Sequence, residues 1–326
     1  MKNTNVMRRQ LLIAGAAAPV LGMLPRTSWA AALESLYMFI PAAPGGGWDS
    51  TGRAIEQALR TAKLVNTVQF ENVGGAGGMV GLPKFVNQQK GKPNAVMVGG
   101  SVMVGAGIAN KSPVTIKDVV PLVRLTEEAS VIAVPTNSPY KTWQDLAAAL
   151  KANPKAVSVA GGSAGGTDHL LLGMILRSLG ANAKSAAYVA YAGGGAAVAS
   201  IIGGQVAAGI SGYSEFAEQI KGGRMRALAV SGNKRIPGVD VPTLKELGTN
   251  VTAANWRGLF GAPGISNAQR DALIDLFTKM HTSPAWVELI GERKWVDVFL
   301  AGDAFAKDLA TDLAETETVM KELGLA

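Results

Sequence analysis

Short apolar segments alternate along this chain with longer segments whose apolar residues recur at helical spacing, and glycine-rich stretches separate the two. Residues 35–40 form an apolar and aromatic run typical of a buried strand, and residues 54–62 then carry apolar residues at helical spacing. The glycine-rich stretch 41–50 lies between them. The same order recurs along the chain and predicts an α/β fold with a parallel or mixed sheet, in which ligands bind at the carboxyl ends of the strands.

Further elements follow from periodicity and from turn and cap residues. Strands are expected at 67–73, 95–99, 119–123, 131–134, 156–160, 187–190, 205–210, 226–230 and 254–263. Helices are expected at 79–86, 142–150, 170–179, 267–280, 284–294 and 304–323, with a small-residue helix that ends at Ile202. We expect Asp49 or Ser50 to cap the first helix, a capping box to open the helix at Thr142, and Ser283 to cap the helix after it.

The pattern also predicts two domains. The polar segment 124–130 separates two expected strands, and the chain becomes rich in proline and glycine between Val230 and Gly248. We therefore expect residues 31–127 and 233–326 to form domain 1 and residues 128–232 to form domain 2, with a ligand cleft between them.

The N-terminal 30 residues have the pattern of a signal peptide. A basic region with Arg8 and Arg9 precedes a mildly apolar segment, 11–24, and Ser28-Trp29-Ala30 has the small residues of a cleavage site. The arginine pair favours the twin-arginine export route. We expect a periplasmic protein that is cleaved after about Ala30.

Charge and cysteine content then exclude several classes of protein. The formal charge falls from +7 to +3 when residues 1–30 are removed, because four basic residues and no acidic residue leave with them. The remaining basic residues are dispersed, which argues against a nucleic-acid surface. The chain has no cysteine and two histidines, so it offers no disulfide, no thiolate chemistry and no typical zinc site.

The glycine loops are the candidate site. In the first of them, residues 41–50, glycines lead directly into a helix, and residues 161–169 repeat this arrangement. Exposed N–H groups at a helix N-terminus and the positive end of its dipole form an anion site. Hydroxyl groups accompany these loops at Ser50, Thr51, Ser101, Ser163, Thr167 and Ser211. This combination, without a base or a nucleophile, is typical of a receptor for a carboxylate or phosphate.

The same residues fit an enzyme less well than a receptor. Gly161 to Gly165 matches the G-x-S-x-G elbow of serine hydrolases, with Ser163 as nucleophile, but His169 follows too closely and His281 ends a helix far along the chain. The glycines at 75 and 77 lack the third glycine and the acidic residue of a dinucleotide site. Arg257 lies inside an apolar strand and is either a structural ion pair or a partner for a carboxylate.

A set of short motifs in a fixed order carries a family resemblance over nearly the whole mature chain. The motifs are Pro44 to Asp49, Glu71-Asn72, Gly75 to Gly78, Gly162-Ser163 with Thr167 and His169, Tyr191 with the glycines after it, Arg226 to Val230, Val241 to Thr243, and Trp256 to Pro263. Together they resemble the extracytoplasmic solute receptors of tripartite tricarboxylate transporters, the TctC/Bug family.

The resemblance implies a two-domain periplasmic binding fold, type II-like, that closes on a carboxylated solute and delivers it to membrane permease subunits. Loops 46–49 and 163–169 would hold one carboxylate from both sides, partly through water. We expect no enzymatic activity, no cofactor and no metal, and a monomer. The expected ligand-binding residues are Gly46, Gly47, Trp48, Asp49, Gly77, Ser101, Ser163, Gly166, Thr167, His169, Tyr191, Gly193, Gly194 and Ser211.

Two positions differ from many members of this family. Residues 206–208 lack an acidic side chain, and Trp48 stands where many members have threonine. Asn255 to Gly258 is similar to the tricarboxylate-type members, which implies a citrate-like or dicarboxylate ligand. Two alternatives stay open at this point: a serine hydrolase that uses Ser163, and a carboxylate receptor that docks onto a membrane sensor.

Overall fold

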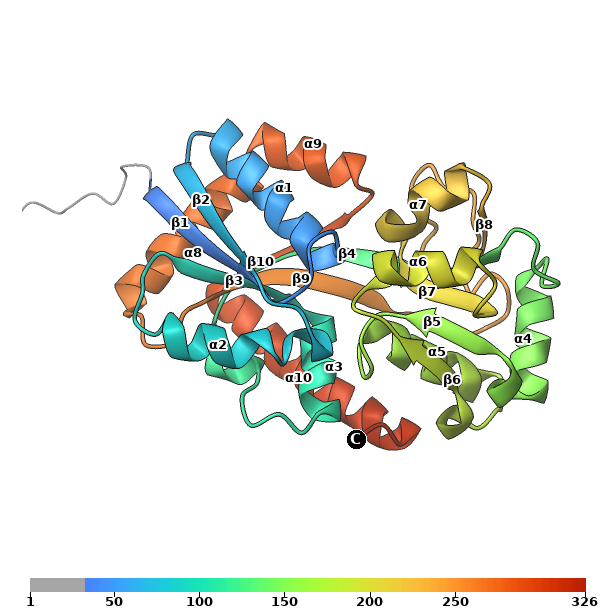
Figure 1. Cartoon of the computed structure of the whole chain (residues 1–326). Helices are drawn as coiled ribbons and strands as arrows, with labels where there is room; N and C mark the ends of the chain where they lie inside the picture. The colour runs from blue at the N-terminus through green and yellow to red at the C-terminus, as the bar shows by residue number, and fades with distance from the viewer. Residues whose placement is uncertain (1–32) are drawn as a thin grey trace, which may run out of the picture. The chain divides into compact units, whose positions relative to one another are not determined.

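The computed structural model describes residues 33–326, so the expected signal peptide and its cleavage site lie outside the described residues. Ten strands of this part form one mixed sheet around β4 (Val120–Pro135), and helices cover both faces (Figure 1). The strand order along the main path is β2-β1-β3-β9-β4-β7-β5-β6, while β8 and β10 also pair with β4. The expectation of a mixed sheet flanked by helices is confirmed.

The strands divide into two groups that share β4. The first group has β1 (Leu33–Ile40), β2 (Val65–Asn72), β3 (Ala95–Gly100), β9 (Ala254–Gly261) and β10 (Val296–Ala301). The second group has β5 (Ser158–Gly161), β6 (Ala187–Ala190), β7 (Ala208–Gly212) and β8 (Met225–Val230). Within the groups, β1 pairs in parallel with β2 and β3, and β5 pairs in parallel with β6 and β7, while β4 is antiparallel to all its neighbours.

Helices cover both groups of strands. The helices are α1 (Gly47–Thr61), α2 (Gly81–Gln88), α3 (Ser101–Ala109), α4 (Trp143–Ala152), α5 (Thr167–Ser178), α6 (Gly194–Ile202), α7 (Tyr213–Lys221), α8 (Asn267–His281), α9 (Pro284–Glu292) and α10 (Gly302–Leu323). In the first group α1 and α9 lie on one face and α2, α3 and α10 on the other (Figure 1). In the second group α6 and α7 lie opposite α5 (Figure 1).

The buried apolar residues form separate clusters that follow the two groups. One cluster contains residues of β1, β3 and β9 with α1, α8 and α9, and includes Phe39 and Trp286. Two further clusters use residues between 131 and 251, on the two faces of the second group of strands. Val241 and Leu244 belong to these clusters, so the proline-rich segment after β8 packs with the second group. The division into domains 31–127 with 233–326, and 128–232, stays a prediction.

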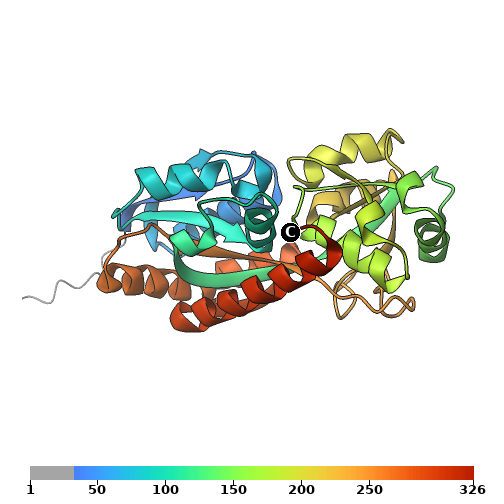
Figure 2. The same cartoon turned by 90° about the horizontal axis from the view of Figure 1, so that it is seen from below.

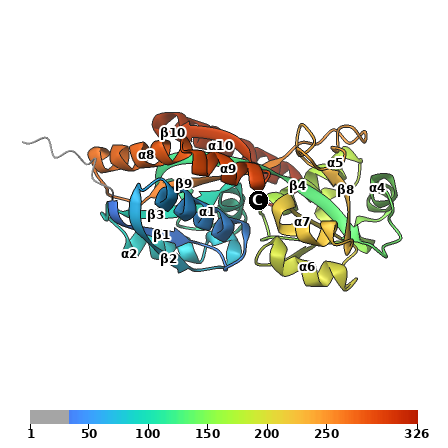
Figure 3. The same ribbon diagram turned by 90° about the horizontal axis from the view of Figure 1, so that it is seen from above.

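Two expectations about β4 and the first cap are wrong. Strands 119–123 and 131–134 are parts of one strand, because the polar residues between them find partners across the sheet instead of forming a link; Figures 2 and 3 show β4 running through both groups. Neither Asp49 nor Ser50 caps α1, since Gly46 is the N-cap and Asp49 lies inside the first turn. The caps at Thr142 and Ser283 are confirmed.

Three elements have no counterpart in the sequence reading. Helix α3 begins directly after β3, α7 begins directly after β7, and β10 pairs with the outer part of β4. Both helices therefore begin at the carboxyl end of a strand, where the ligand loops are also expected. No helix among residues 33–326 is long and apolar enough to cross a membrane.

Candidate ligand-binding site

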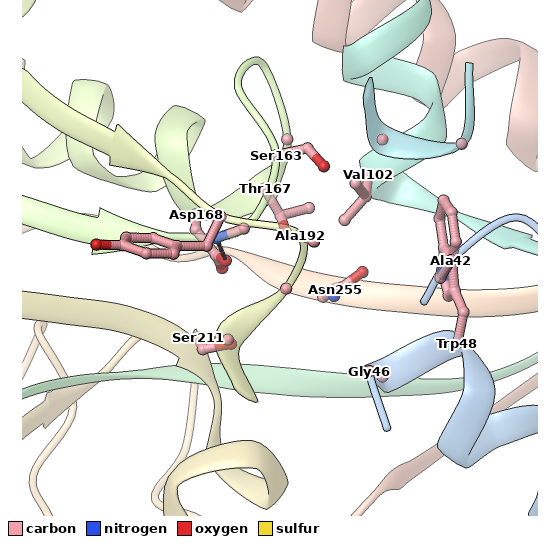
Figure 4. A pocket seen from close by; sticks show the side chains of 18 of the residues that line it. Ala42, Gly46, Trp48, Val102, Ser163, Thr167, Asp168, Ala192, Ser211 and Asn255 are labelled. Atoms are coloured by element: carbon pink, nitrogen blue, oxygen red, sulfur yellow. Dashed lines mark hydrogen bonds between the residues drawn. The ribbon is translucent and has the colours of Figure 1, made fainter. Parts of the chain in front are cut away.

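A cavity of about 460 Å³ lies where the carboxyl ends of the strands of both groups meet. Its volume is in the range of small-molecule sites. Loops after β1, β2, β5 and β6, together with the start of β9, form its wall. Figure 4 shows Ser163 and Thr167 on one side, Ala42, Trp48 and Val102 on the other, with Asn255 on the strand between them.

Most of the expected site residues line this cavity. Eleven of the fourteen do so: Gly46, Gly47, Trp48, Gly77, Ser163, Gly166, Thr167, Tyr191, Gly193, Gly194 and Ser211. They come from four loops and from the end of β7, so the fold brings together residues that are up to 165 positions apart in the sequence, as 46 and 211 are. Their role in binding stays a prediction at this point.

The other three expected residues do not line the cavity, and their side chains bond to the chain itself. Asp49 accepts a hydrogen bond from the backbone N–H of Gly45, and His169 accepts one from that of Gly165. The hydroxyl of Ser101 accepts a hydrogen bond from the backbone N–H of Trp256 at 2.9 Å. These three residues hold loops and strands that border the site.

Four helices begin at the cavity wall. Helices α1, α5, α6 and α7 begin behind Gly46, Gly166, Gly193 and Gly212, which all line the cavity. None of these glycines provides a side-chain cap, so the first N–H groups of each helix lack the partner that a cap would supply.

Three of the helices that begin elsewhere have side-chain caps. Helices α4, α8 and α9 begin behind Thr142, Ser266 and Ser283, and each of these hydroxyls accepts a hydrogen bond from an N–H of the first turn. The three helices with a capping hydroxyl thus all begin away from the cavity, although α2, α3 and α10 also begin elsewhere without a side-chain cap. Free N–H groups at a helix N-terminus, next to the positive end of the helix dipole, are suited to bind an anion.

The N-terminus of α6 already has an anionic partner within the chain. Glu215 of α7 accepts hydrogen bonds from the Ser211 hydroxyl at 2.6 Å and from the backbone N–H of Gly195. The contact is close, since a Cβ built on Gly194 would lie 1.9 Å from Ser211 Oγ and 3.1 Å from Glu215 Oε2. Ser214 of α7 likewise donates its backbone N–H to Glu128, which leaves α1 and α5 as the cavity helices whose first N–H groups have no acidic partner in the described chain.

The cavity wall contains three charged residues, Asp168, Glu215 and Arg257, of which sequence reasoning missed the two acids. Arg257 is 2% exposed, and its Nη2 atom donates to Glu128 Oε2 at 2.7 Å. Glu128 in turn accepts a hydrogen bond from the backbone N–H of Ser214 at 2.6 Å. Arg257 therefore forms a structural ion pair with Glu128, which is one of the two roles that the sequence left open.

Arg257 also has N–H donors without hydrogen-bond partners in the described chain. Its Nε and Nη1 atoms are buried and have no hydrogen-bond partner within residues 33–326. The guanidinium lies against the α1 N-terminus, because a Cβ built on Gly47 would be 2.8 Å from Nη2. Thr167 Oγ1 and Asn255 Oδ1 are likewise buried and without a partner in the described chain. Buried polar atoms are normally paired, so these atoms mark places where a ligand or water completes the site.

Asp168 is the most unusual acid of the cavity. It is 8% exposed, accepts a hydrogen bond from the backbone N–H of Gly162 at 2.9 Å and contacts the Ser130 hydroxyl at 3.5 Å. Burial raises its pKa to about 7, and the nearby Glu215 adds to the rise, while Gly162, Ser130 and Arg257 oppose it. Burial also raises the pKa of Glu215.

Ser163 has no base within the described residues. His169 uses Nδ1 to accept from Gly165, its ring stacks on Tyr188 at 4.3 Å, and burial lowers its pKa. His281 pairs with Asp297 at the end of α8, outside the cavity lining. Residues 33–326 therefore contain no Ser-His arrangement at Ser163, and the hydrolase alternative has no geometric support.

Comparisons with known proteins agree on one family. The family described as tripartite tricarboxylate transporter family receptor, TctC, matches residues 52–325. Protein BugT of Bordetella pertussis is 26% identical over 294 residues, which are 89% of either chain. The solved structure of the periplasmic binding protein BugD superposes with a TM-score of 0.79 at 22% identity, over 90% of this chain and 98% of that one. MatC from Rhodopseudomonas palustris, solved with bound malate, gives a TM-score of 0.77 at 21% identity, over 88% and 98% of the two chains.

The fold is that of a periplasmic binding protein, a class that binds solutes and is not enzymatic. Within this class the chain belongs to the tripartite tricarboxylate transporter receptor family, TctC. The family works with a tripartite transporter, and the resemblance found in the sequence motifs is confirmed.

Proposed function

We propose that this protein binds an organic carboxylate in the cavity between α1 and α5 and delivers it to the membrane permease subunits of a tripartite transporter. Di- and tricarboxylates such as citrate are the first candidates. Closure of two domains around the solute would be the mechanism, with the expected domains 31–127 with 233–326, and 128–232. The malate in the MatC structure supports a carboxylate as the class of ligand.

One observation carries this proposal. Two helix N-termini with glycine caps, at Gly46 and Gly166, border one cavity beside the unpaired Nε and Nη1 atoms of Arg257. A carboxylate accepts hydrogen bonds only, so it matches N–H groups that have no other partner. Hydrogen bonds between such donors and an anion are also stronger than those between neutral groups.

The expected binding residues then have distinct roles. The first N–H groups of α1 and α5 bind carboxylate oxygens, and the hydroxyls of Ser163 and Thr167 add donors on the α5 side. Trp48 and Gly77 limit the space available to the solute. The hydroxyls of Tyr191 and Ser211 bond to Ser200 and Glu215, so these two residues shape the wall more than they bind the ligand.

The test is a titration of the purified protein with citrate, other di- and tricarboxylates, aromatic acids and amino acids. Thermal shift and tryptophan fluorescence are followed together, because a ligand that binds the native state raises its melting temperature by mass action. We expect a shift with one class of carboxylate and no consumption of that compound. A flat response to all carboxylates, in protein shown by mass spectrometry to be free of ligand, would contradict the proposal.

A double variant, Ser163→Ala with Thr167→Ala, checks that the binding takes place in this cavity. Both hydroxyls lie in the wall, and no hydrogen bond of the described chain depends on Thr167 Oγ1. We expect weaker binding of the same carboxylate with nearly unchanged thermal stability. An unaltered dissociation constant would move the site elsewhere.

A further inference from the structure

The cavity has an acceptor side as well as a donor side. Asp168 and Glu215 line it together with Arg257, and all three side chains are largely buried. Two carboxyl groups do not stabilise a bound anion, so we expect at least one of them to contact another part of the ligand.

The two acids differ in their remaining capacity to accept hydrogen bonds. Glu215 is occupied by the Ser211 hydroxyl and the backbone N–H of Gly195. Asp168 has one good hydrogen bond, from Gly162 N at 2.9 Å to Oδ2, and a long one from Ser130 Oγ at 3.5 Å to Oδ1. A carboxylate has about four acceptor sites on its two oxygens. Asp168 therefore retains capacity to accept a further donor.

Asp168 has no cation of its own. Within residues 33–326 it forms no ion pair, and Arg257, the cation that acts on it, is paired with Glu128 at 2.7 Å. The other groups that face Asp168 are Glu215 from α7 and Tyr188 from β6. Burial of a carboxylate that has no cation beside it is costly, and a donor from a ligand would reduce that cost.

We propose that Asp168 selects carboxylates that also carry a hydrogen-bond donor, a hydroxyl or an ammonium group, close to the carboxylate held by α1, α5 and Arg257. The inference rests on the proposed function, because it assigns the second half of the same ligand. Figure 4 shows Asp168 next to Thr167, so a group bound by Asp168 lies a short distance from the α5 N-terminus. A carboxylate whose neighbouring carbon has only hydrogens would leave Asp168 without that donor.

The burial of Asp168 makes it suited to distinguish a carboxylate that carries a hydrogen-bond donor from an analogue that lacks the donor. A site built to accept a hydrogen bond discriminates strongly against a ligand that lacks the donor, because the buried acceptor then stays unpaired. Burial raises the pKa of Asp168 to about 7 although Gly162 and Ser130 donate to it, so a further donor from a ligand would stabilise its charged form. Asp168 is thus a specificity-determining residue, and the helix N-termini supply the affinity for the carboxylate.

The experiment compares matched pairs of ligands that differ by the donor alone. Malate and aspartate are each compared with succinate, and citrate with tricarballylate, by isothermal titration calorimetry at pH 7.5. We expect the donor-bearing member of at least one pair to bind tenfold or more tightly than its analogue. Comparison of malate with aspartate then shows whether the preferred donor is a hydroxyl or an ammonium group.

The variant Asp168→Asn assigns the preference to its side chain. An amide would keep its oxygen on the N–H of Gly162 and turn its NH₂ group toward the ligand, so the tenfold preference should disappear or reverse. Asp275→Asn, on the exposed surface of α8, is the matched control and should leave the preference unchanged. Near-ultraviolet circular dichroism checks that the Asp168 variant is folded.

The outcomes separate the two proposals. Pairs that bind to wild-type protein with affinities within threefold of each other would overturn the role of Asp168, even if the variant does not fold. A preference that survives in folded Asp168→Asn would overturn it as well. If no member of any pair binds and the wider carboxylate panel is also flat, the proposed function itself fails, whereas equal binding within all pairs leaves that function standing.

Discussion

Asp49 and His169 have the same position in two different helices. Each is the third residue of its helix, and each accepts a hydrogen bond from the backbone N–H of the glycine four residues before it. The distances are 3.0 Å from Gly45 N to Asp49 Oδ2 and 3.1 Å from Gly165 N to His169 Nδ1. The chain thus builds one loop geometry twice, with different side chains, on two sides of one cavity.

The backbone of the two loops agrees as well. The N-cap residues Gly46 and Gly166 have φ −80°, ψ 173° and φ −77°, ψ 179°, and the glycines before them have φ +83° and +75°. A residue with a side chain rarely adopts such positive φ values, so glycine is needed before each cap. Both loops therefore depend on a glycine and on an acceptor in the third helical position.

Replacement of Asp49 should disturb the first loop. Its carboxylate accepts hydrogen bonds from Gly45 N and Asn72 Nδ2, both at 3.0 Å, and it is 8% exposed. Asp49→Ala leaves both donors without this partner, so we expect a loss of about 2–3 kcal/mol in the free energy of unfolding and weaker carboxylate binding. Urea denaturation and calorimetry measure the two effects.

Asp49→Asn is the control, because the amide oxygen can still accept from Gly45. It should retain most of the stability and affinity that Asp49→Ala loses. If Asp49→Ala is as stable as wild type and binds normally, the hydrogen bond to Gly45 does not support the loop.

The buried pair of Arg257 and Glu128 links stability to binding. Arg257→Met leaves the carboxylate of Glu128, which is 2% exposed, without its cation, and we expect a loss of about 3–5 kcal/mol in the free energy of unfolding. Adding Glu128→Gln removes the unpaired charge and keeps an acceptor for the N–H of Ser214. The double variant should recover much of the stability, as measured by urea denaturation.

Binding should not recover in that double variant, because the Nε and Nη1 donors of Arg257 are still missing. Calorimetry with the preferred carboxylate therefore separates the two roles of this arginine. Wild-type affinity in the stable double variant would show that Arg257 is structural only.

Two glycines of α3 provide a matched test of the contact between this helix and the loop 163–166. A Cβ built on Gly105 would lie 2.2 Å from the carbonyl oxygen of Gly165, whereas the atom nearest to a Cβ on Gly107 is 3.7 Å away. We expect Gly105→Ala to push the loop away from α3 and to weaken carboxylate binding at least tenfold. Gly107→Ala should bind normally, and the gain in helix propensity should leave it as stable or more stable.

Dissociation constants of the two variants, measured side by side, decide this prediction. Equal affinity in Gly105→Ala and wild type would mean that the ligand is bound without this approach of the loop to α3. Reduced affinity in both variants would point to a general effect of alanine in α3.

The titration of Asp168 should be visible in the stability of the protein. Its pKa is raised from 3.8 to about 7, so between these values the native state holds a proton that the unfolded chain has released. The contribution of Asp168 to stability is therefore present at low pH and is lost as the pH rises toward 7. Each unit of pKa difference corresponds to about 1.4 kcal/mol.

Asp168→Asn removes this titration. We expect the stability of the variant, relative to wild type, to rise by roughly 1 kcal/mol per pH unit between pH 5 and pH 7, and to stay level above that range. Glu215 and Arg257 are present in both proteins, so the difference reports Asp168 together with its coupling to Glu215. Urea denaturation at several pH values measures it, and parallel curves for the two proteins would exclude a raised pKa.

The sequence was informative where structure depends on local chemistry. The alternation of strand, glycine loop and helix predicted the α/β fold, and capping boxes such as that at Thr142 were recognised because the partners lie three residues apart. The glycine loops led to eleven of the residues that line the cavity. Glycine at a helix start is a signal that a single sequence can carry.

Long-range partners explain what was missed. The polar residues of β4 looked like a link between domains, but Glu128 pairs with Arg257, which is 129 positions away. Helix α3 contains glycine and valine, which have low helix propensity, and it forms because it packs on α10 and the loop 76–78. Asp168 and Glu215 were not expected, since nothing in the sequence suggests that acids line a cavity for an anion.

The most direct test of the central claim is a structure of the complex with the carboxylate that binds best. The account predicts carboxylate oxygens within hydrogen-bond distance of N–H groups at the start of α1 and α5 and of Arg257, with a hydroxyl or ammonium group next to Asp168. A ligand bound outside this cavity, or bound in it with its carboxylate away from both helix N-termini, would contradict the account.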